Sequence, residues 1–222
     1  MNIALILAGG VGKRSGSKIP KQFIRINDKP LIVYTLEQFE KNSNIDKICV
    51  TCVKDWIKEV ESFKEEYGIS KLQLVCEGGN SGLESLKNGL EMLNCKDEDY
   101  IIIHDAVRPF IDQSIIDDNI NTAYKYGLAM ASVECVETLV KVDENGYSKT
   151  MIPRDNVMRV QTPQTFKYSI IKDIDFTKQD APSIFALYMQ QGNAIYCSKG
   201  NDKNIKITYP SDVEYFKKLF EE

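Results

Sequence analysis

Apolar runs of strand length alternate with segments of helical periodicity over the first half of the chain. The runs predict strands at 2–8, 46–53, 71–76 and 99–104, and the periodic segments predict helices at 30–42, 55–67, 81–94 and 113–126. Such alternation is typical of right-handed βαβ units and a mostly parallel, doubly wound sheet. We therefore expect an α/β, Rossmann-like fold in which residues 1–222 form one domain.

The helix expected at 81–94 has the clearest local signals. Ser81 and Glu84 have the spacing of a capping box, in which each side chain accepts a hydrogen bond from a backbone N–H at the start of the helix. An apolar stripe follows on one face, formed by Leu83, Leu86, Leu90 and Leu93.

The pattern changes after Ala129. A strand is followed by two extended pieces around an Asn145-Gly146 turn, which predicts a β-hairpin. We interpret residues 134–158 as a β-arm, and because an isolated hairpin is marginal in water, we expect it to pack on a second copy in a homodimer. The remaining pattern predicts a helix near 181–191, strands at 193–198 and 204–208, and a terminal helix from Pro210.

Composition limits the partners of the protein. A net charge of -4 and a pI of about 5.3 provide no general attraction to nucleic acid or to an anionic membrane. The first apolar stretch has no charged leading segment and is interrupted at Gly9-Gly10, so we expect neither a signal peptide nor a membrane span. These features predict a cytoplasmic protein that binds small molecules.

The six cysteines lie mostly inside apolar runs, which is typical of reduced, buried thiols. Cys49 and Cys52 have the spacing of metal ligands. They lie in one expected strand, however, where residues three apart face opposite sides, and the chain offers no second pair of Cys or His. We therefore expect no zinc site.

The first strand leads directly into a basic, glycine-rich loop. Glycines at 9, 10 and 12 let backbone N–H groups approach a ligand, and the cations Lys13, Arg14, Lys18 and Lys21 follow closely. Cations at this density need a compensating anion, which favours a polyphosphate over a solvated basic loop.

Spacing separates three kinds of phosphate loop. A Walker loop needs a hydroxyl after Gly12-Lys13, but Arg14 stands there. A dinucleotide loop needs a third glycine and an immediate helix, but position 15 is Ser and the loop continues past Pro20. A nucleoside triphosphate fits the charge better than a dinucleotide does.

Further polar groups follow the other expected strands, at the sheet edge where ligands bind in open α/β folds. Asp105 and Arg108 follow the strand at 99–104 and could bind Mg²⁺ and phosphate. His104 is the only histidine, and its place in a buried strand favours a structural role over that of a base. Lys206 alternates with Ile205 and Ile207, so we expect it to face the site.

Five segments together resemble the polyol-phosphate cytidylyltransferase family. They are LAGGVGKR (7–14), PKQF (20–23), HDAVRPF (104–110), QTPQ (161–164) and NIKIT (204–208). The resemblance covers essentially the whole chain. It implies a nucleotidyltransferase fold, a homodimer with interlocking arms, and a Mg²⁺-dependent reaction of CTP with a polyol phosphate that releases pyrophosphate.

The resemblance also implies roles for individual residues. Charge on the α-phosphate would be stabilised by Arg14, Lys21 and Lys206. The nucleotide would be held by Ala8, Gly9, Gly10, Gly12 and Lys13, and its cytosine read by Gly79, Asn80 and Ser85. The acceptor would be bound by Asp105, which also holds the metal, by Arg108 and Asp202, and by Thr138 and Arg154 from the arm of the partner subunit.

Two positions bear on the kind of function. Family members usually have arginine three residues after the Gly78-Gly79 pair, where this chain has Gly82, so a non-catalytic nucleotide-binding dimer is one alternative. Val107 resembles the ribitol 5-phosphate branch of the family more than the 2-C-methyl-D-erythritol 4-phosphate branch of isoprenoid synthesis. We expect D-ribitol 5-phosphate as the acceptor and keep the methylerythritol phosphate as its alternative. An NAD(P)-dependent oxidoreductase is disfavoured because the third glycine is missing.

Overall fold

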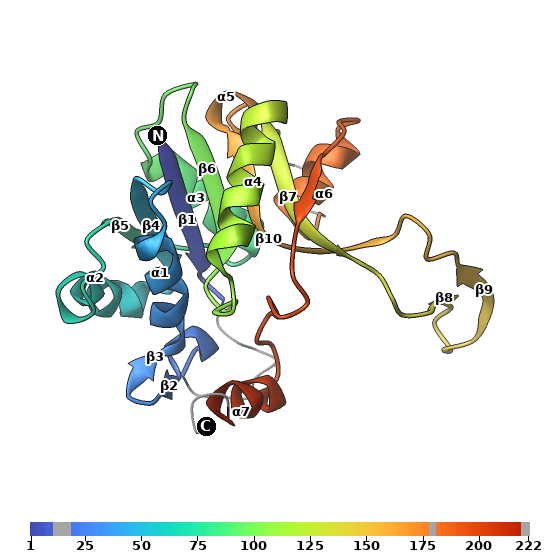
Figure 1. Ribbon diagram of the computed structural model, residues 1–222, viewed down its shortest axis with the longest axis horizontal. Helices are drawn as coiled ribbons and strands as arrows, with labels where there is room; N and C mark the ends of the chain where they lie inside the picture. Colours follow the sequence, from blue (N-terminus) through green and yellow to red (C-terminus); the bar gives the residue numbers. More distant parts are fainter. Residues whose placement is uncertain (11–18, 178–180, 219–222) are drawn as a thin grey trace.

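A seven-stranded mixed sheet forms the centre of the computed structural model, which describes residues 1–10, 19–177 and 181–218 (Figure 1). Its strand order is β11-β7-β10-β6-β1-β4-β5. The strands are β1 (Asn2–Ala8), β4 (Lys47–Cys52), β5 (Leu72–Glu77), β6 (Tyr100–Asp105), β7 (Leu128–Glu134), β10 (Met158–Lys167) and β11 (Cys197–Lys199). All pairs are parallel except those of β10 with β6 and β7, so the expected α/β, mostly parallel sheet is confirmed.

Helices cover both faces of the sheet, as expected for a doubly wound fold. One face is covered by α1 (Leu31–Lys41), α2 (Ile57–Glu66) and α4 (Gln113–Tyr126), and the other by α3 (Gly82–Met92), α5 (Tyr168–Ile171) and α6 (Ile184–Gln190). In β1, Ala4 and Ile6 pack under the first layer while Ile3 and Leu5 pack under the second. The strand is therefore apolar throughout, because it is buried on both faces.

The start of α3 forms largely as its sequence predicts. Glu84 N donates to Ser81 Oγ at 3.1 Å, which caps the helix. The Glu84 carboxylate accepts from Asn80 N at 2.8 Å, one residue earlier than in a standard capping box. Leu83, Leu86 and Leu90 are buried as expected, and Leu93 follows the last turn and is partly buried.

The sequence-based expectation is incomplete or wrong in the second half of the chain. The antiparallel strand β10 is absent from it, because the polar residues 161–164 read as a connection. The strand expected at 193–198 is reduced to β11, and residues 204–208 form no strand. Ile207 there instead donates its backbone N–H to Val107 O at 2.9 Å and buries its side chain against Phe216 of α7 (Pro210–Lys218), which satisfies the apolar pattern without a ladder.

The predicted hairpin is present within residues 134–158. Its strands are β8 (Leu139–Val142) and β9 (Ser148–Ile152), and the turn has Gly146 at φ +79°. Asp143 Oδ1 accepts from Asn145 N and Tyr147 N, which closes the turn. The arm projects away from the sheet and its helices (Figure 1).

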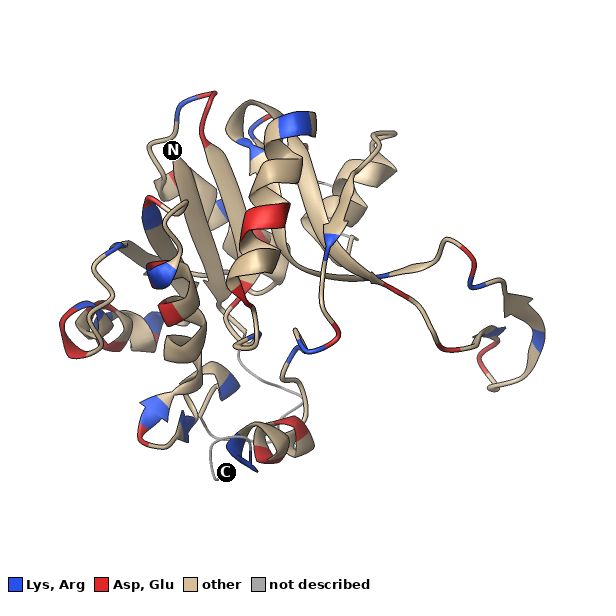
Figure 2. Ribbon diagram, viewed as in Figure 1, with Lys and Arg blue, Asp and Glu red and all other residues tan. Residues whose placement is uncertain are grey.

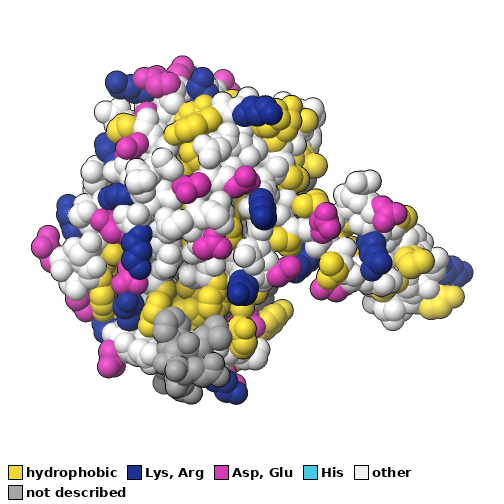
Figure 3. Space-filling model, viewed as in Figure 1, with side chains coloured by type: hydrophobic (Ala, Val, Ile, Leu, Met, Phe, Trp, Pro, Cys, Tyr) yellow, Lys and Arg dark blue, Asp and Glu magenta, His cyan; other side chains and the backbone are white. Residues whose placement is uncertain are grey.

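The arm differs from the rest of the molecule in its surface. Charged residues lie mainly on helices, loops and the arm, and those on the sheet strands lie at or next to the strand ends (Figure 2). Hydrophobic side chains are also exposed on the arm (Figure 3), among them Val136, Val140, Val142, Tyr147 and Met151. A pair of strands cannot bury such side chains by itself.

Most of the cysteines are buried, as their apolar surroundings predict. All six are free, and Cys49, Cys52, Cys76 and Cys135 are buried. Burial raises the pKa of Cys49 and of Cys52 to about 12, so these thiols are protonated near neutral pH. Within the described ranges no group of three Cys, His, Asp or Glu side chains could hold a metal ion, and none of the helices there has the length and apolar character needed to cross a bilayer.

Candidate active site

A cleft of about 510 Å³ opens at the carboxyl ends of the parallel strands β1 and β6. Its walls come from five separate segments: the end of β1, the short helix η1 (Lys21–Phe23), the turn into α3, the end of β6 with the two residues after it, and the residues before α7. Chain segments far apart in the sequence therefore meet at the edge of the sheet where ligands bind in this class of fold.

Glycines let two of these segments touch. A Cβ atom on Gly9 would lie 2.6 Å from Ser85 Oγ, and one on Gly78 would lie 3.1 Å from Gly9 Cα. Ser85 Oγ accepts from Gly79 N at 2.9 Å and donates to Ser81 O at 2.9 Å, which holds the turn in place. The cleft wall here is backbone, so a ligand can approach peptide N–H groups closely.

A buried glutamine supports the start of the glycine loop. Gln22 Nε2 donates to Ala8 O at 2.6 Å and to Gly10 O at 2.9 Å. These bonds tie η1 to the end of β1, so Lys21 lines the same cleft as Gly9 and Gly10.

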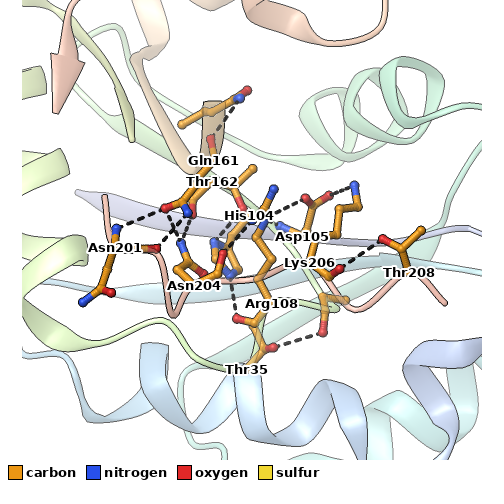
Figure 4. A network of polar contacts seen from close by, with 12 residues as sticks. Thr35, His104, Asp105, Arg108, Gln161, Thr162, Asn201, Asn204, Lys206 and Thr208 are labelled. Atoms are coloured by element: carbon orange, nitrogen blue, oxygen red, sulfur yellow. Dashed lines mark hydrogen bonds and ion pairs between the residues drawn. The ribbon is translucent and has the colours of Figure 1, made fainter. Parts of the chain in front are cut away.

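Three charged side chains meet beside the glycine wall (Figure 4). Lys206 Nζ donates to Asp105 Oδ1 at 3.0 Å, and Arg108 Nε donates to Asp105 Oδ2 at 3.1 Å. Burial alone would raise the pKa of the Asp105 carboxyl, but the positive charges of Lys206 and Arg108 outweigh it and lower that pKa below its ordinary value. With two cations and one carboxylate, the cluster therefore carries a net positive charge at the edge of the cleft.

Arg108 is more engaged than its sequence context suggests. Besides Asp105 it binds Asn204 O through Nη1 at 2.7 Å, and its side chain is only 11% exposed. Two of its donor groups are therefore already used within the protein. This geometry favours bracing of the cluster over the free bidentate fork expected for an acceptor phosphate.

His104 has the structural role that its buried strand predicts. The side chain is fully buried, with Nδ1 2.9 Å from Thr162 Oγ1 and Nε2 3.2 Å from Arg108 O. Burial lowers the pKa of the imidazole to about 3, so it is neutral near physiological pH. It does not line the cleft.

The structure brings most of the expected nucleotide-site residues together. The cleft is lined by Ala8, Gly9, Gly10, Lys21, Gly79, Asn80, Ser85, Asp105 and Lys206. Gly12, Lys13 and Arg14 lie outside the described residues. Gly82 also lines the cleft, and in the described part of the chain no atom beyond its own turn of helix lies within 4 Å of the position that its Cβ would occupy.

The remaining expected acceptor residues lie outside the cleft of this chain. Thr138 and Arg154 belong to the arm, where Arg154 Nη1 donates to Val136 O at 2.9 Å. Arg154 also lines a separate cavity of about 660 Å³ at the base of the arm. Asp202 pairs with Arg159 of β10, which also approaches Glu137 of the arm.

Asp105 is the residue whose chemistry suits a metal at this site. Mg²⁺ in phosphate-transfer sites is commonly held by one or two carboxylates together with substrate phosphate oxygens. Asp105 supplies one carboxylate at the edge of the cleft, and Lys206, its partner at Oδ1, is 42% exposed and has room to move. The residues present therefore fit such an ion.

A polar network behind Lys206 was not assigned a role from the sequence. It joins Gln161 and Thr162 of β10 to Asn201 and Asn204 (Figure 4). Gln161 and Thr162 stand in the QTPQ segment and Asn204 in the NIKIT segment, but amide side chains in a polar stretch are equally typical of turns. The resemblance to a family was therefore the only sign of their importance.

The sheet-edge cleft, with backbone on one wall and cations on the other, is typical of enzymes that transfer nucleotidyl groups. The chain belongs to the IspD family, since the family model described as 2-C-methyl-D-erythritol 4-phosphate cytidylyltransferase matches residues 2–221. It is accordingly a cytidylyltransferase, as the sequence resemblance predicts. Enzymes of this family use CTP and a phosphorylated sugar alcohol and generally depend on a divalent metal ion.

Similar proteins carry both acceptor names. The chain is 35% identical to a ribitol-5-phosphate cytidylyltransferase of Lacticaseibacillus paracasei, covering 100% of this chain and 99% of that one. It is 36% identical to a 2-C-methyl-D-erythritol 4-phosphate cytidylyltransferase of Clostridium novyi, covering 99% and 96%. The Francisella tularensis enzyme of the latter name has the same fold, with a TM-score of 0.79 at 27% identity over 97% of each chain.

Proposed function

We propose that this protein transfers the cytidylyl group of CTP to D-ribitol 5-phosphate, forming CDP-ribitol and pyrophosphate. The observation that carries the proposal is the Lys206–Asp105–Arg108 cluster beside a glycine-walled cleft. The similarity to ribitol-5-phosphate cytidylyltransferases of Lacticaseibacillus paracasei and Vibrio parahaemolyticus, at 35% and 38% identity, supports this acceptor.

In the proposed reaction, the phosphate of the acceptor attacks the α-phosphorus of CTP in line and pyrophosphate leaves. A phosphate dianion is already a nucleophile near neutral pH, so positioning and charge neutralisation carry the catalysis and no strong base is needed. Lys21 and Lys206, together with Arg14, would stabilise charge on the α-phosphate. Backbone at Ala8, Gly9, Gly10 and Gly12 and the Lys13 side chain would hold the triphosphate.

The nucleotide base would be read at the turn into α3. Gly79 and Asn80 line the cleft there, and the Ser85 hydroxyl shapes the turn, so cytosine edges could meet backbone groups. Mg²⁺, when bound, would neutralise phosphate oxygens, and Asp105 would hold it.

The acceptor would bind between two subunits of a homodimer. Asp105 and Asp202 would contribute from one chain, with Arg108 holding Asp105 in place, and Thr138 and Arg154 would contribute from the arm of the other. In this proposal residues 1–222 are one catalytic domain and 134–158 are its dimerisation element. The exposed apolar side chains of the arm support the pairing, because a second copy would bury them.

The second candidate acceptor is 2-C-methyl-D-erythritol 4-phosphate, which the description of the family model and the Clostridium novyi relative favour. Val107 lines the cleft, but its side chain is only 6% exposed and packs with Ile207 and Phe216, so it gives little basis for choosing between the two acceptors.

A pyrophosphate-release assay tests the proposal. The four common nucleoside triphosphates are crossed with ribitol 5-phosphate, 2-C-methyl-D-erythritol 4-phosphate and glycerol 3-phosphate, with Mg²⁺ present. We expect release with CTP and ribitol 5-phosphate at a kcat/KM well above that of every other pair. Preference for the methylerythritol phosphate would replace the acceptor, and CTP binding without any release would support the non-catalytic alternative.

A further inference from the structure

Lys206 lies in a segment without regular secondary structure, so its position depends on its neighbours. Two of these neighbours are completely buried: Asn204, two residues before it, and Ile207, directly after it. Ile207 is held by its backbone bond to Val107 and by apolar packing against Phe216. One anchor fixes a point on a chain but leaves the chain free to pivot about it.

Asn204 supplies the second anchor. Its Nδ2 donates to Thr162 O at 2.8 Å and to Gln161 Oε1 at 3.3 Å, which binds the segment to strand β10. Its backbone carbonyl accepts from Arg108 Nη1 at 2.7 Å, and its backbone N–H donates to Asn201 O at 2.9 Å. A fully buried amide side chain with such partners is costly to displace.

These contacts close a ring around the catalytic cluster (Figure 4). From Asn204 the ring runs through Arg108 to Asp105, then to Lys206, and returns along two residues of backbone. Arg108 therefore holds both the carboxylate that Lys206 binds and the backbone that carries Lys206. Movement of Asn204 would shift the lysine and loosen its brace together.

We propose that Asn204 is a positioning residue that fixes the Lys206 ammonium group at the cleft. This inference rests on the proposed catalytic role of Lys206. Asn204 does not line the cleft itself, so it acts through Lys206 and the Arg108 brace. Misplacement of a catalytic group by about 1 Å can lower a rate by about 100-fold.

A double-mutant cycle separates positioning from general stability. We expect Asn204→Ala to lower kcat by about 10- to 100-fold while changing the KM for CTP by less than about threefold, because the lost interaction is made mainly in the transition state. In a Lys206→Ala background the same substitution should lower kcat by less than about twofold more, since residues acting as a unit are non-additive.

Asn119→Ala is the matched control. Asn119 is also fully buried and makes two side-chain hydrogen bonds, to Ser198 and Thr165, away from the cluster. Any loss of activity in this variant should be the same in the presence and absence of Lys206. If Asn204→Ala is additive with Lys206→Ala, or leaves kcat unchanged, the positioning role is wrong.

Folding is followed by the fluorescence of Trp56, the single tryptophan, during thermal unfolding. If Asn204→Ala is poorly folded, the double-mutant cycle is repeated with Asn204→Ser, which keeps a polar side chain. If neither variant folds, a role of Asn204 that is specific to Lys206 is overturned. If Lys206→Ala itself retains normal turnover, the proposed function of Lys206 fails. If Lys206→Ala is impaired and Asn204 is merely additive with it, only this inference fails.

Discussion

Lys206 and Asp105 are 101 positions apart in sequence and 3.0 Å apart in the structure. They meet because the end of β6 and the segment before α7 lie at the same edge of the sheet. Lys21 reaches this cleft from a third segment, held there through its neighbour Gln22. The positive charge of the site is thus assembled from residues that only the fold brings together.

Neutralising either lysine should mainly slow the chemical step. We expect Lys21→Ala and Lys206→Ala each to lower kcat by about 100-fold, the usual cost of removing one preorganised group that stabilises transition-state charge. Steady-state pyrophosphate release measures the effect. Lys203→Ala removes an exposed cation from the same segment as Lys206 and should stay within about threefold of the unmodified protein, the modest effect expected of a charge that does not contact the transition state. Near-normal turnover in both lysine variants would contradict their catalytic role.

Gly9 and Gly10 provide a second comparison of single residues. A methyl group on Gly9 would lie 2.6 Å from Ser85 Oγ, whereas among the described residues no non-neighbouring atom lies within 4 Å of the corresponding position on Gly10. We expect Gly9→Ala to lower the midpoint of thermal unfolding and Gly10→Ala to leave it nearly unchanged. Ser85→Ala should partly restore Gly9→Ala by removing the clashing hydroxyl. Equal unfolding midpoints for the two glycine variants would refute the close approach of the two loops.

The arm exposes several large apolar side chains that a single chain does not bury. Val136 and Met151 are each 66% exposed, and Val140 and Val142 are more than half exposed. We expect a dimer by light scattering, and we expect Val140→Asp combined with Met151→Asp to produce monomers, because charge is costly in a buried apolar contact. Met92→Asp changes an equally exposed side chain on α3 and should leave the dimer intact. A monomeric unmodified protein that is active would refute the shared site.

The elements that sequence predicts well are those with strong periodicity. The eight elements expected between residues 2 and 126 follow apolar runs and amphipathic stripes whose burial the structure matches. Strand β10 is hidden because its residues at 161–164 are largely polar, and they bind Asn201 and Asn204, which lie outside the sheet. The segment 204–208 alternates like a strand, but its hydrogen bonds run to separate groups, some in nearby residues such as Asn201 and some in distant ones such as Val107 and Thr162, and they form no ladder. The hydrophobic pattern of a sequence indicates which residues are buried, but it does not indicate which other segment of the chain buries them.

The candidate site, too, is only partly predictable from the sequence. Its glycines and cations can be predicted, because residues of these types are typical of phosphate-binding loops. The hydrogen bonds of Arg108 to Asn204 and of Asn204 to Thr162 cannot be predicted in this way, because they join residues that are far apart in the sequence.

At the scale of the whole molecule, the proposal needs two subunits to complete one acceptor site. Arg154→Ala should raise the acceptor KM or lower kcat by about 10- to 100-fold while sparing CTP affinity, since a charge-assisted pair contributes about 1.5–3 kcal/mol. Mixing equal amounts of the Arg154→Ala and Lys21→Ala proteins should restore about a quarter of full activity. After subunit exchange half of the dimers contain one chain of each kind, and each of these dimers has one intact site out of two. Subunit exchange without recovery would show that the arm does not act across the interface.

The central claim is that this cleft joins cytidylyl to a ribitol phosphate, and ³¹P NMR of the reaction tests it most directly. With CTP, ribitol 5-phosphate and Mg²⁺, we predict that the CTP signals are replaced by equal amounts of pyrophosphate and a diphosphate diester joining cytidine to ribitol. Lys206→Ala should slow both by about 100-fold. Unchanged CTP, or its conversion to CDP and orthophosphate or to CMP without the diester, would contradict the account.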